Sequence, residues 1–175
     1  LETGAPDPVN GFQALYGTQY SKEEIDQALA APDPLALVPS ADENGHGTFL
    51  ASVAAGGEDP DQDFTGAAPK ASIAMVKLKP AKEYLRDFYL IREGADAYQE
   101  NDIMMGVAYL LHLARRFSMP LVICLGLGTN QGSHVGKSPL GLYLDDINIY
   151  AGTAVITAAG NETGYGHHYR AVTRP

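Results

Sequence analysis

The sequence contains little cysteine, no tryptophan and few basic residues. Its single cysteine, Cys124, has no partner for a disulfide within the chain. Only 12 Lys and Arg stand against 21 Asp and Glu, so the 175 residues carry a formal net charge of −9. Nucleic acids and anionic membrane surfaces both attract clustered basic residues. We therefore expect neither as a partner.

The sequence also lacks a continuous apolar stretch of about 18 residues, so no membrane span is predicted. It shows no signal-peptide pattern and no internal repeat. The chain begins at Leu1 rather than Met and closes at Pro175, which favours the interpretation that flanking segments of the same parent chain are missing. The remaining composition, 45% hydrophobic and 19% charged, is typical of a globular protein with a sizeable core.

Hydrophobic patterns predict an alternation of helices and strands. Ser21 followed by Glu24 forms a capping box, which predicts a helix start. Apolar residues recur at three- and four-residue steps from 103 to 114, which predicts the longest helix. Helices are expected at 21–31, 49–55, 101–116 and 140–150, and strands at 72–78, 121–125 and 153–157. The helix at 49–55 has small apolar residues and is expected in the core.

The three predicted strands are apolar throughout and separated by helices, which indicates a parallel sheet covered on both faces. The expected fold is α/β with three layers, a mostly parallel sheet between helices with a Rossmann-like core, and it is incomplete. Cys124, inside an apolar strand, is expected to be a buried thiol. Four segments are distinguished: a loop-rich start (1–41), a histidine-bearing helix with its strand (42–80), an inserted lobe (81–100) and an α/β core (101–175).

One histidine stands in a setting that suits catalysis. His46 lies between Gly45 and Gly47 at the start of a helix of small residues. Glycines allow a tight turn that leaves the imidazole unobstructed, and a general base needs such rigid, accessible placement. The alternative is a histidine that only satisfies a loop hydrogen bond.

A second candidate follows the predicted strand at 153–157. There Ala158, Ala159 and Gly160 lead to Asn161. A side-chain amide at the carboxyl end of a strand can donate a hydrogen bond to a developing oxyanion. The alternative is an asparagine that caps a turn, because Gly-Asn is a common turn dipeptide.

Together, Gly-His-Gly-Thr and Ala-Ala-Gly-Asn, in this order within an α/β alternation, resemble the motifs of subtilisin-like serine peptidases, the subtilases. The resemblance implies that His46 is the general base and Asn161 the oxyanion donor of a serine endopeptidase. It also implies a subtilisin-like fold, a peptide or protein substrate and no organic cofactor. The phrase at 126–134 and the insertion after residue 77 are similar to the branch that contains clostridial spore-germination proteases, which implies an extracytoplasmic or spore-associated setting.

The same resemblance implies where a peptide binds. Residues 126–128 stand where the family has a segment whose main chain pairs with extended substrate, and residues 158–160 stand where it has the far wall of the specificity pocket. The implied substrate-binding residues are Gly126, Leu127, Gly128, Ala158, Ala159 and Gly160. Residues 66–69, Gly-Ala-Ala-Pro, resemble the family's turn before the next strand.

The catalytic machinery in this sequence is nevertheless incomplete. No aspartate precedes Ser-Gly or Thr-Gly, and no serine lies in a Gly-Thr-Ser motif. A triad needs nucleophile, base and orienting carboxylate within hydrogen-bond reach, and only the base is identifiable. We therefore predict that this chain alone is inactive. The alternative is a catalytically dead subtilase-like sensor or scaffold.

Two glycine-containing stretches resemble nucleotide-binding motifs. Residues 126–132 imitate a dinucleotide fingerprint, but the third glycine is one position late. Residues 132–138 resemble the P-loop motif, but Gln131 occupies a position where the motif requires glycine. A small-molecule-binding doubly wound domain is the alternative that the first motif leaves open.

Two further clusters suggest metals without completing a site. The aspartates at 59, 61 and 63 alternate as in a calcium loop, but Phe64 occupies the glycine position. His167 and His168 are adjacent, with no third ligand nearby. No metal site is predicted.

Overall fold

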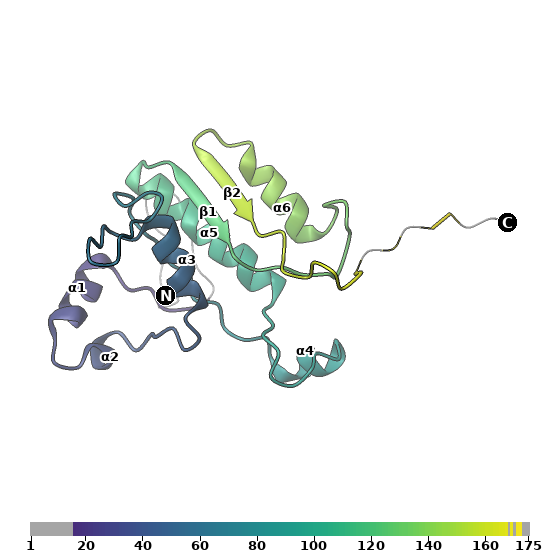
Figure 1. Cartoon of the computed structure of the whole chain (residues 1–175), viewed down its shortest axis with the longest axis horizontal. Coiled ribbons are helices and arrows are strands. Elements are labelled where there is room, and N and C mark those ends of the chain that lie inside the picture. The colour runs from purple at the N-terminus through teal and green to yellow at the C-terminus, as the bar shows by residue number, and fades with distance from the viewer. Residues whose placement is uncertain (1–15, 168, 170, 173–175) are drawn as a thin grey trace. The chain divides into compact units, whose positions relative to one another are not determined.

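The computed structural model describes residues 16–167, 169 and 171–172. The chain divides into two compact units, Leu1–Lys77 and Leu78–Pro175, whose elements are labelled in Figure 1. Residues 1–15 of the predicted loop-rich start, and His168, lie outside the described residues.

In the first unit, α1 (Lys22–Ala30) confirms the first predicted helix and its capping box. The Glu24 N–H donates to Ser21 Oγ at 3.3 Å, and the Ser21 N–H donates to Glu24 Oε2 at 2.6 Å. α1 packs against α2 (Pro34–Leu37), a short helix that the sequence analysis missed. Its signal was Pro34 at the first helical position, where a missing N–H costs nothing.

The second predicted helix forms but is not in a core. α3 (His46–Ala55) ends at the predicted residue and begins three residues earlier. None of its residues is buried, and Phe49 and Val53 are 65% and 46% exposed. The predicted core position is therefore wrong, because burial depends on a covering neighbour and not on small apolar residues alone.

The predicted strand at 72–78 does not form. In the part of the chain that the structure describes, these residues belong to no helix or strand, and Ile73 and Met75 are 57% and 56% exposed. A strand requires hydrogen bonds to a neighbour, which composition alone cannot supply. Lys77 Nζ donates to the Ala41 carbonyl at 2.6 Å, so the end of this segment is tied to the residue before Asp42.

The second unit begins with a closed loop. The Ala81 N–H donates to the Ala97 carbonyl at 2.8 Å, and Arg86 donates to the Ala95 carbonyl at 2.7 Å. The loop contains α4 (Glu83–Phe88). The two ends of the loop, at Ala81 and Ala97, are therefore close together, as in compact surface loops.

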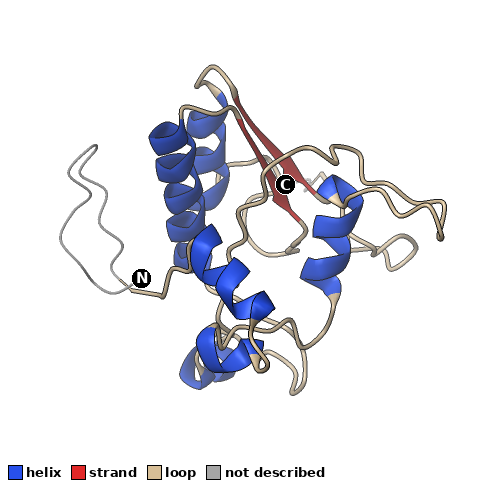
Figure 2. Ribbon diagram, turned by 90° about the vertical axis from the view of Figure 1, so that its left-hand side faces the viewer, coloured by secondary structure: helices blue, strands red, loops and turns tan. Residues whose placement is uncertain are grey.

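The rest of this unit confirms the predicted alternation of helices and strands. The order is α5 (Glu100–Phe117), β1 (Leu121–Leu125), α6 (Pro139–Asn148) and β2 (Thr153–Thr157). The two strands are parallel, with Leu121 opposite Thr153 and Leu125 opposite Thr157 (Figure 2). Val107, Ile123 and Ile147 are each 2% exposed and form the core that joins α5, β1 and α6.

The two faces of this sheet differ. Successive side chains of a strand point to opposite faces, so Ile123 packs into the core while Val122 and Cys124 point the other way. Val122 is 71% exposed, Ile156 is 56% exposed, and Cys124 is exposed. The prediction of a buried Cys124 is therefore wrong, because among the described residues helices cover only one face of β1. The structure shows a mixed α/β fold with a two-stranded parallel sheet.

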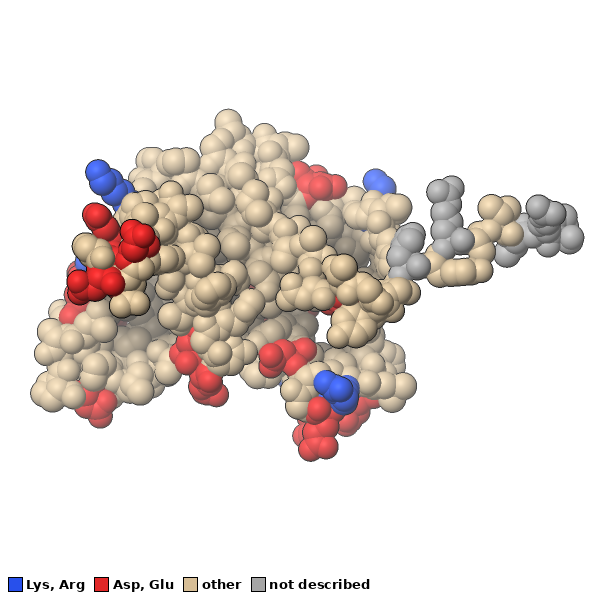
Figure 3. Space-filling view, viewed as in Figure 1, with Lys and Arg blue, Asp and Glu red and all other residues tan. Residues whose placement is uncertain are grey.

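The charge of the chain lies mostly at the surface, where acidic side chains outnumber basic ones on the face drawn in Figure 3. One acid is buried. Asp102 is 5% exposed in the first turn of α5 and lies 3.7 Å from Lys79 Nζ. Among the described helices, none has the length and apolarity needed to cross a membrane.

Candidate functional site

A tight loop sets the position of His46, the first residue of α3. Gly45 at the N-cap has a φ of +82°, a left-handed conformation that favours glycine. The His46 N–H donates to Asn44 Oδ1 at 2.8 Å, and the residue is exposed. The imidazole is therefore accessible, as its predicted role requires, and the role itself stays a prediction.

A carboxylate that the sequence analysis did not single out closes this loop. Asp42 accepts hydrogen bonds from the Thr48 hydroxyl at 2.7 Å, from the Thr48 N–H at 2.9 Å and from the Gly45 N–H at 2.8 Å. These hydrogen bonds lower the pKa of Asp42 far below its ordinary value, and the bond from the Thr48 hydroxyl has the largest effect. An aspartate shortly before a glycine turn is a known signal for such side-chain closure.

The far end of α3 is held by residues 66–68, part of the Gly-Ala-Ala-Pro segment. Their N–H groups donate to the carbonyls of Gly56, Val53 and Ala54 at 3.0, 3.0 and 2.8 Å, in that order. The last carbonyls of a helix have no partner inside the helix, so these three bonds satisfy groups that water would otherwise bind. α3 is thus fixed at both ends.

Gly66→Ala is expected to lower the free energy of unfolding by about 1–3 kcal/mol through overpacking. An added Cβ would lie 2.7 Å from the Ser52 carbonyl oxygen and 2.9 Å from that of Gly56, and backbone atoms cannot easily move away. Urea denaturation followed by circular dichroism measures the loss. Gly57→Ala is the control, because a Cβ there meets nothing within 4 Å. Equal losses in both variants would contradict close packing at Gly66.

The two segments predicted to bind a peptide lie side by side in the second unit. Residues 126–128 follow β1 and residues 158–160 follow β2, and the Ala158 N–H donates to the Leu125 carbonyl at 3.2 Å. Parallel strands end at the same sheet edge, where α/β proteins bind ligands. Gly126 and Leu127 are partly buried, whereas Gly128, Ala158, Ala159 and Gly160 are exposed.

Asn161 is exposed in the loop after β2, next to the predicted pocket wall. The preceding Gly160 has a φ of +89°, and the Glu162 carboxylate occupies the space that a Cβ on Gly160 would need. Asn161 lies three residues after Ala158, so it belongs to a loop at the same end of the sheet as residues 126–128. His46 belongs to the other unit, Leu1–Lys77.

Among the described residues, the other motifs lie in loops and turns. No helix opens directly after the glycines at 126–132, because the chain remains a loop until α6 begins at Pro139. His167 Nδ1 lies 2.9 Å from Asn130 Nδ2, a contact between the loops after β1 and β2. Within the described residues, no three His, Cys, Asp or Glu side chains gather closely enough to hold a metal ion.

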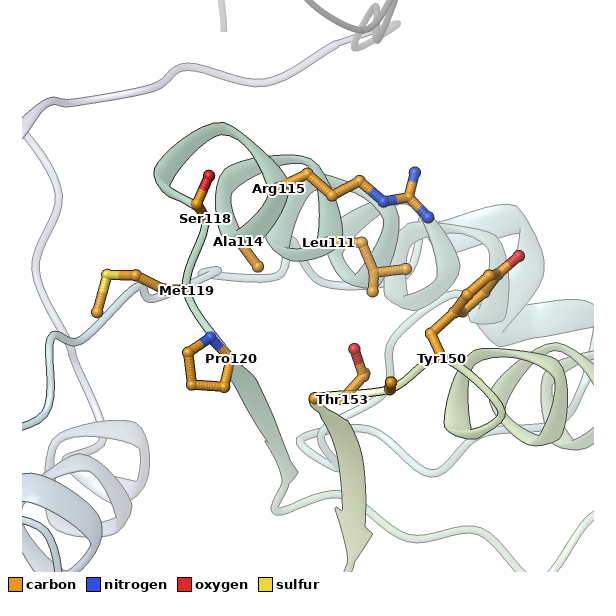
Figure 4. Close-up of a pocket in the computed structure, with 10 residues that line it drawn as sticks. Leu111, Ala114, Arg115, Ser118, Met119, Pro120, Tyr150 and Thr153 are labelled. Atoms are coloured by element: carbon orange, nitrogen blue, oxygen red, sulfur yellow. The ribbon is translucent and has the colours of Figure 1, made fainter.

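A hollow of about 420 Å³ lies at the other end of the sheet, where β1 and β2 begin (Figure 4). Its walls include Leu111 and Arg115 of α5 and Tyr150 before β2. The Arg115 guanidinium lies 5.6 Å from the centre of the Tyr150 ring. Because the predicted peptide-binding segments follow the carboxyl ends of the strands, this hollow is not part of the candidate site.

The chain is similar to known proteins in both sequence and structure. The model of the subtilase family matches residues 18–174. The structure of the Clostridium perfringens CspB protease is similar, with 33% sequence identity and a TM-score of 0.73. The similarity covers 93% of this chain and 32% of the CspB protease chain, so this chain spans about a third of that protein. No curated protein sequence matches the chain.

Proposed function

Because this chain belongs to the subtilase family, we propose that it supplies the general base and the oxyanion donor of a serine endopeptidase. His46 is the base and Asn161 the donor. The nucleophilic serine and the orienting carboxylate come from outside these residues, since the family's motifs for both are absent from the sequence. The observation that carries the proposal is that residues 126–128 and residues 158–161 directly follow two paired parallel strands, at whose carboxyl ends the Ala158 N–H donates to the Leu125 carbonyl.

In the proposed reaction the serine oxygen attacks the carbonyl carbon of a peptide bond while its proton moves to His46. Asn161 donates a hydrogen bond to the resulting oxyanion. The C–N bond then breaks, and the proton on His46 goes to the leaving amine. Water then gives a proton to the same imidazole and attacks the acyl carbon. The bond between that carbon and the serine oxygen breaks, and the serine oxygen takes the proton back from His46.

The proposed substrate is an extended peptide that adds a strand along residues 126–128. Main-chain groups of an extended peptide can be satisfied by backbone groups at an exposed sheet edge. Residues 158–160 are small and exposed, so they leave room for a substrate side chain beside that backbone. Such contacts require no net charge, which is consistent with an acidic chain.

We also propose the full three-layer fold for the complete catalytic domain. The uncovered face of the sheet carries Val122, Cys124 and Ile156. Exposure of such an apolar surface to water is unfavourable. Helices on this face would bury it, as the predicted three-layer architecture requires.

A second candidate function is a catalytically dead sensor or scaffold. The absence of the nucleophile and orienting-carboxylate motifs from these 175 residues favours it. The two candidates differ in one observation, which is whether the complete reading frame holds Asp-Ser/Thr-Gly and Gly-Thr-Ser.

Fluorophosphonate labelling tests the proposed function. The 175-residue chain is expected to cleave no labelled casein, because it lacks the nucleophile. The protein made from the complete reading frame is expected to be labelled at its serine, and His46→Ala should remove most of that labelling. His134→Ala, in the exposed loop after β1, is the control and should be labelled normally. Full labelling of His46→Ala, or cleavage by the chain alone, would refute the assigned roles.

A further inference from the structure

The loop before α3 is organised around one carboxylate. We propose that Asp42 is a positioning residue for His46, which holds the backbone on both sides of the imidazole. This inference rests on the proposed function and names a residue that acts through the proposed base.

Four donors converge on the two oxygens of Asp42. Oδ1 accepts from the N–H groups of Asn44 and Gly45 at 3.1 and 2.8 Å. Oδ2 accepts from the N–H and the hydroxyl of Thr48 at 2.9 and 2.7 Å. These donors stand on either side of His46 in the sequence, so the carboxylate clamps the residue from both directions.

The clamp replaces a helix cap that α3 lacks. The N-cap residue is Gly45, which has no side chain to accept from the first turn. A larger residue there would be strained, because its φ is +82°. Asp42, three residues before Gly45, caps the helix instead, because its carboxylate accepts the N–H of Thr48 at the third helical position. Its negative charge also lies at the helix end that favours anions.

An ionised carboxylate fits this task and an amide does not. A carboxylate only accepts, and two oxygens can take four hydrogen bonds. Asn at position 42 would keep one accepting oxygen, and its NH₂ group would face one of the two donor pairs, either Asn44 with Gly45 or the two groups of Thr48. The lowered pKa of Asp42 keeps the carboxylate ionised at every pH at which a neutral imidazole can act as a base.

This placement has a catalytic consequence. A general base must lie within hydrogen-bond reach of its proton, at roughly 2.6–3.2 Å. A misplacement of about 1 Å can lower a rate by roughly 10². A base on a loosened backbone would lose rate in the chemical step and would leave peptide binding at residues 126–128 unchanged.

Nuclear magnetic resonance of the 175-residue chain tests the clamp directly. In Asp42→Asn, the ¹⁵N order parameters of Gly45, His46 and Gly47 are expected to fall from about 0.85 to below about 0.6. The ring signal of His46 should broaden, and the other histidine signals should stay unchanged. Asp59→Asn is the matched control, because Asp59 accepts backbone N–H groups in a different turn of the same unit. A lower unfolding midpoint with unchanged order at His46 would show a merely structural role and overturn the proposal.

Two further variants keep the test decisive if Asp42→Asn fails to fold. Thr48→Val removes only the hydroxyl donor and should give the same changes at His46 with smaller amplitude. Thr48→Ser keeps both donors and should restore the wild-type spectrum. Identical spectra for Thr48→Val and the wild type would count against the clamp.

The same variants in the complete protein separate this inference from the proposed function. Asp42→Asn is expected to lower kcat by roughly tenfold to a hundredfold with little change in KM, in line with a misplaced base. If the wild-type complete protein shows neither labelling nor activity, the proposed function is refuted. The order parameters of the 175-residue chain would still test whether Asp42 holds the backbone around His46. An active protein with unchanged kcat in Asp42→Asn would remove the positioning role alone.

Discussion

Replacing Ile123 by alanine is expected to lower the free energy of unfolding of the Leu78–Pro175 unit by about 2–5 kcal/mol. Ile123 lies in the middle of β1, is 2% exposed and packs with Val107 of α5 and Ile147 of α6. Truncation removes the transfer free energy of three carbon atoms and leaves a cavity between two helices and the sheet. Urea denaturation followed by circular dichroism measures the loss.

The neighbouring residue provides a matched control. Val122→Ala changes the same strand by one position but affects a side chain that is 71% exposed on the opposite face. Its expected effect is within about 0.5 kcal/mol, as for most surface substitutions. Similar losses from the two variants would show that α5 and α6 do not pack on the Ile123 face of β1.

The elements that local patterns specify were predictable from the sequence. The capping box at Ser21 and Glu24 placed the start of α1, and the apolar repeat from 103 to 114 placed α5. The apolar runs at 121–125 and 153–157 became the two strands with the predicted parallel pairing. For each of these helices and strands, neighbouring residues carry the signal, because hydrogen bonds and helix faces repeat over a few positions. The parallel pairing was inferred from the alternation of strands with helices.

The errors share one physical cause, which is that burial and strand pairing depend on distant neighbours. Residues 72–78 have a strand's composition, but in the described structure no partner strand pairs with them. Cys124 sits in an apolar run, yet it faces the uncovered side of β1. Phe49 and Val53 suit a core helix, but both side chains are exposed in the described structure. Local patterns in one sequence do not indicate which distant segments will cover a helix or pair with a strand.

In the candidate site, too, some features were predictable from local sequence patterns and others were not. Residues 126–128 and residues 158–161 follow the ends of neighbouring parallel strands, and the sequence predicted both strands. The clamp by Asp42 was missed, since it depends on four donors that converge only after the backbone turns left-handed at Gly45. The motif around His46 predicts a base, and the folded loop shows which carboxylate accepts hydrogen bonds from residues on both sides of it.

Asn161→Ala is expected to lower kcat of the complete protein by roughly 10²–10³, a range measured for the same kind of donor in subtilisin. KM should change little, because the oxyanion exists only in the transition state and the tetrahedral intermediate. Asn130→Ala is the matched control, since Asn130 is an exposed amide in the neighbouring loop and pairs with His167. Kinetics with a chromogenic peptide measure both constants.

The pattern of the two constants decides between roles for Asn161. A lower kcat with constant KM supports oxyanion stabilisation, whereas a higher KM with constant kcat would show that Asn161 only contacts bound substrate. Loss of fluorophosphonate labelling together with a lower unfolding midpoint would instead show a turn cap, the alternative that Gly160 and Asn161 allow. Because Asn161 is exposed after β2 and belongs to no core, the unfolding midpoint should stay unchanged. An active Asn161→Ala protein with wild-type constants would therefore remove the oxyanion role while leaving the assignment of His46 intact.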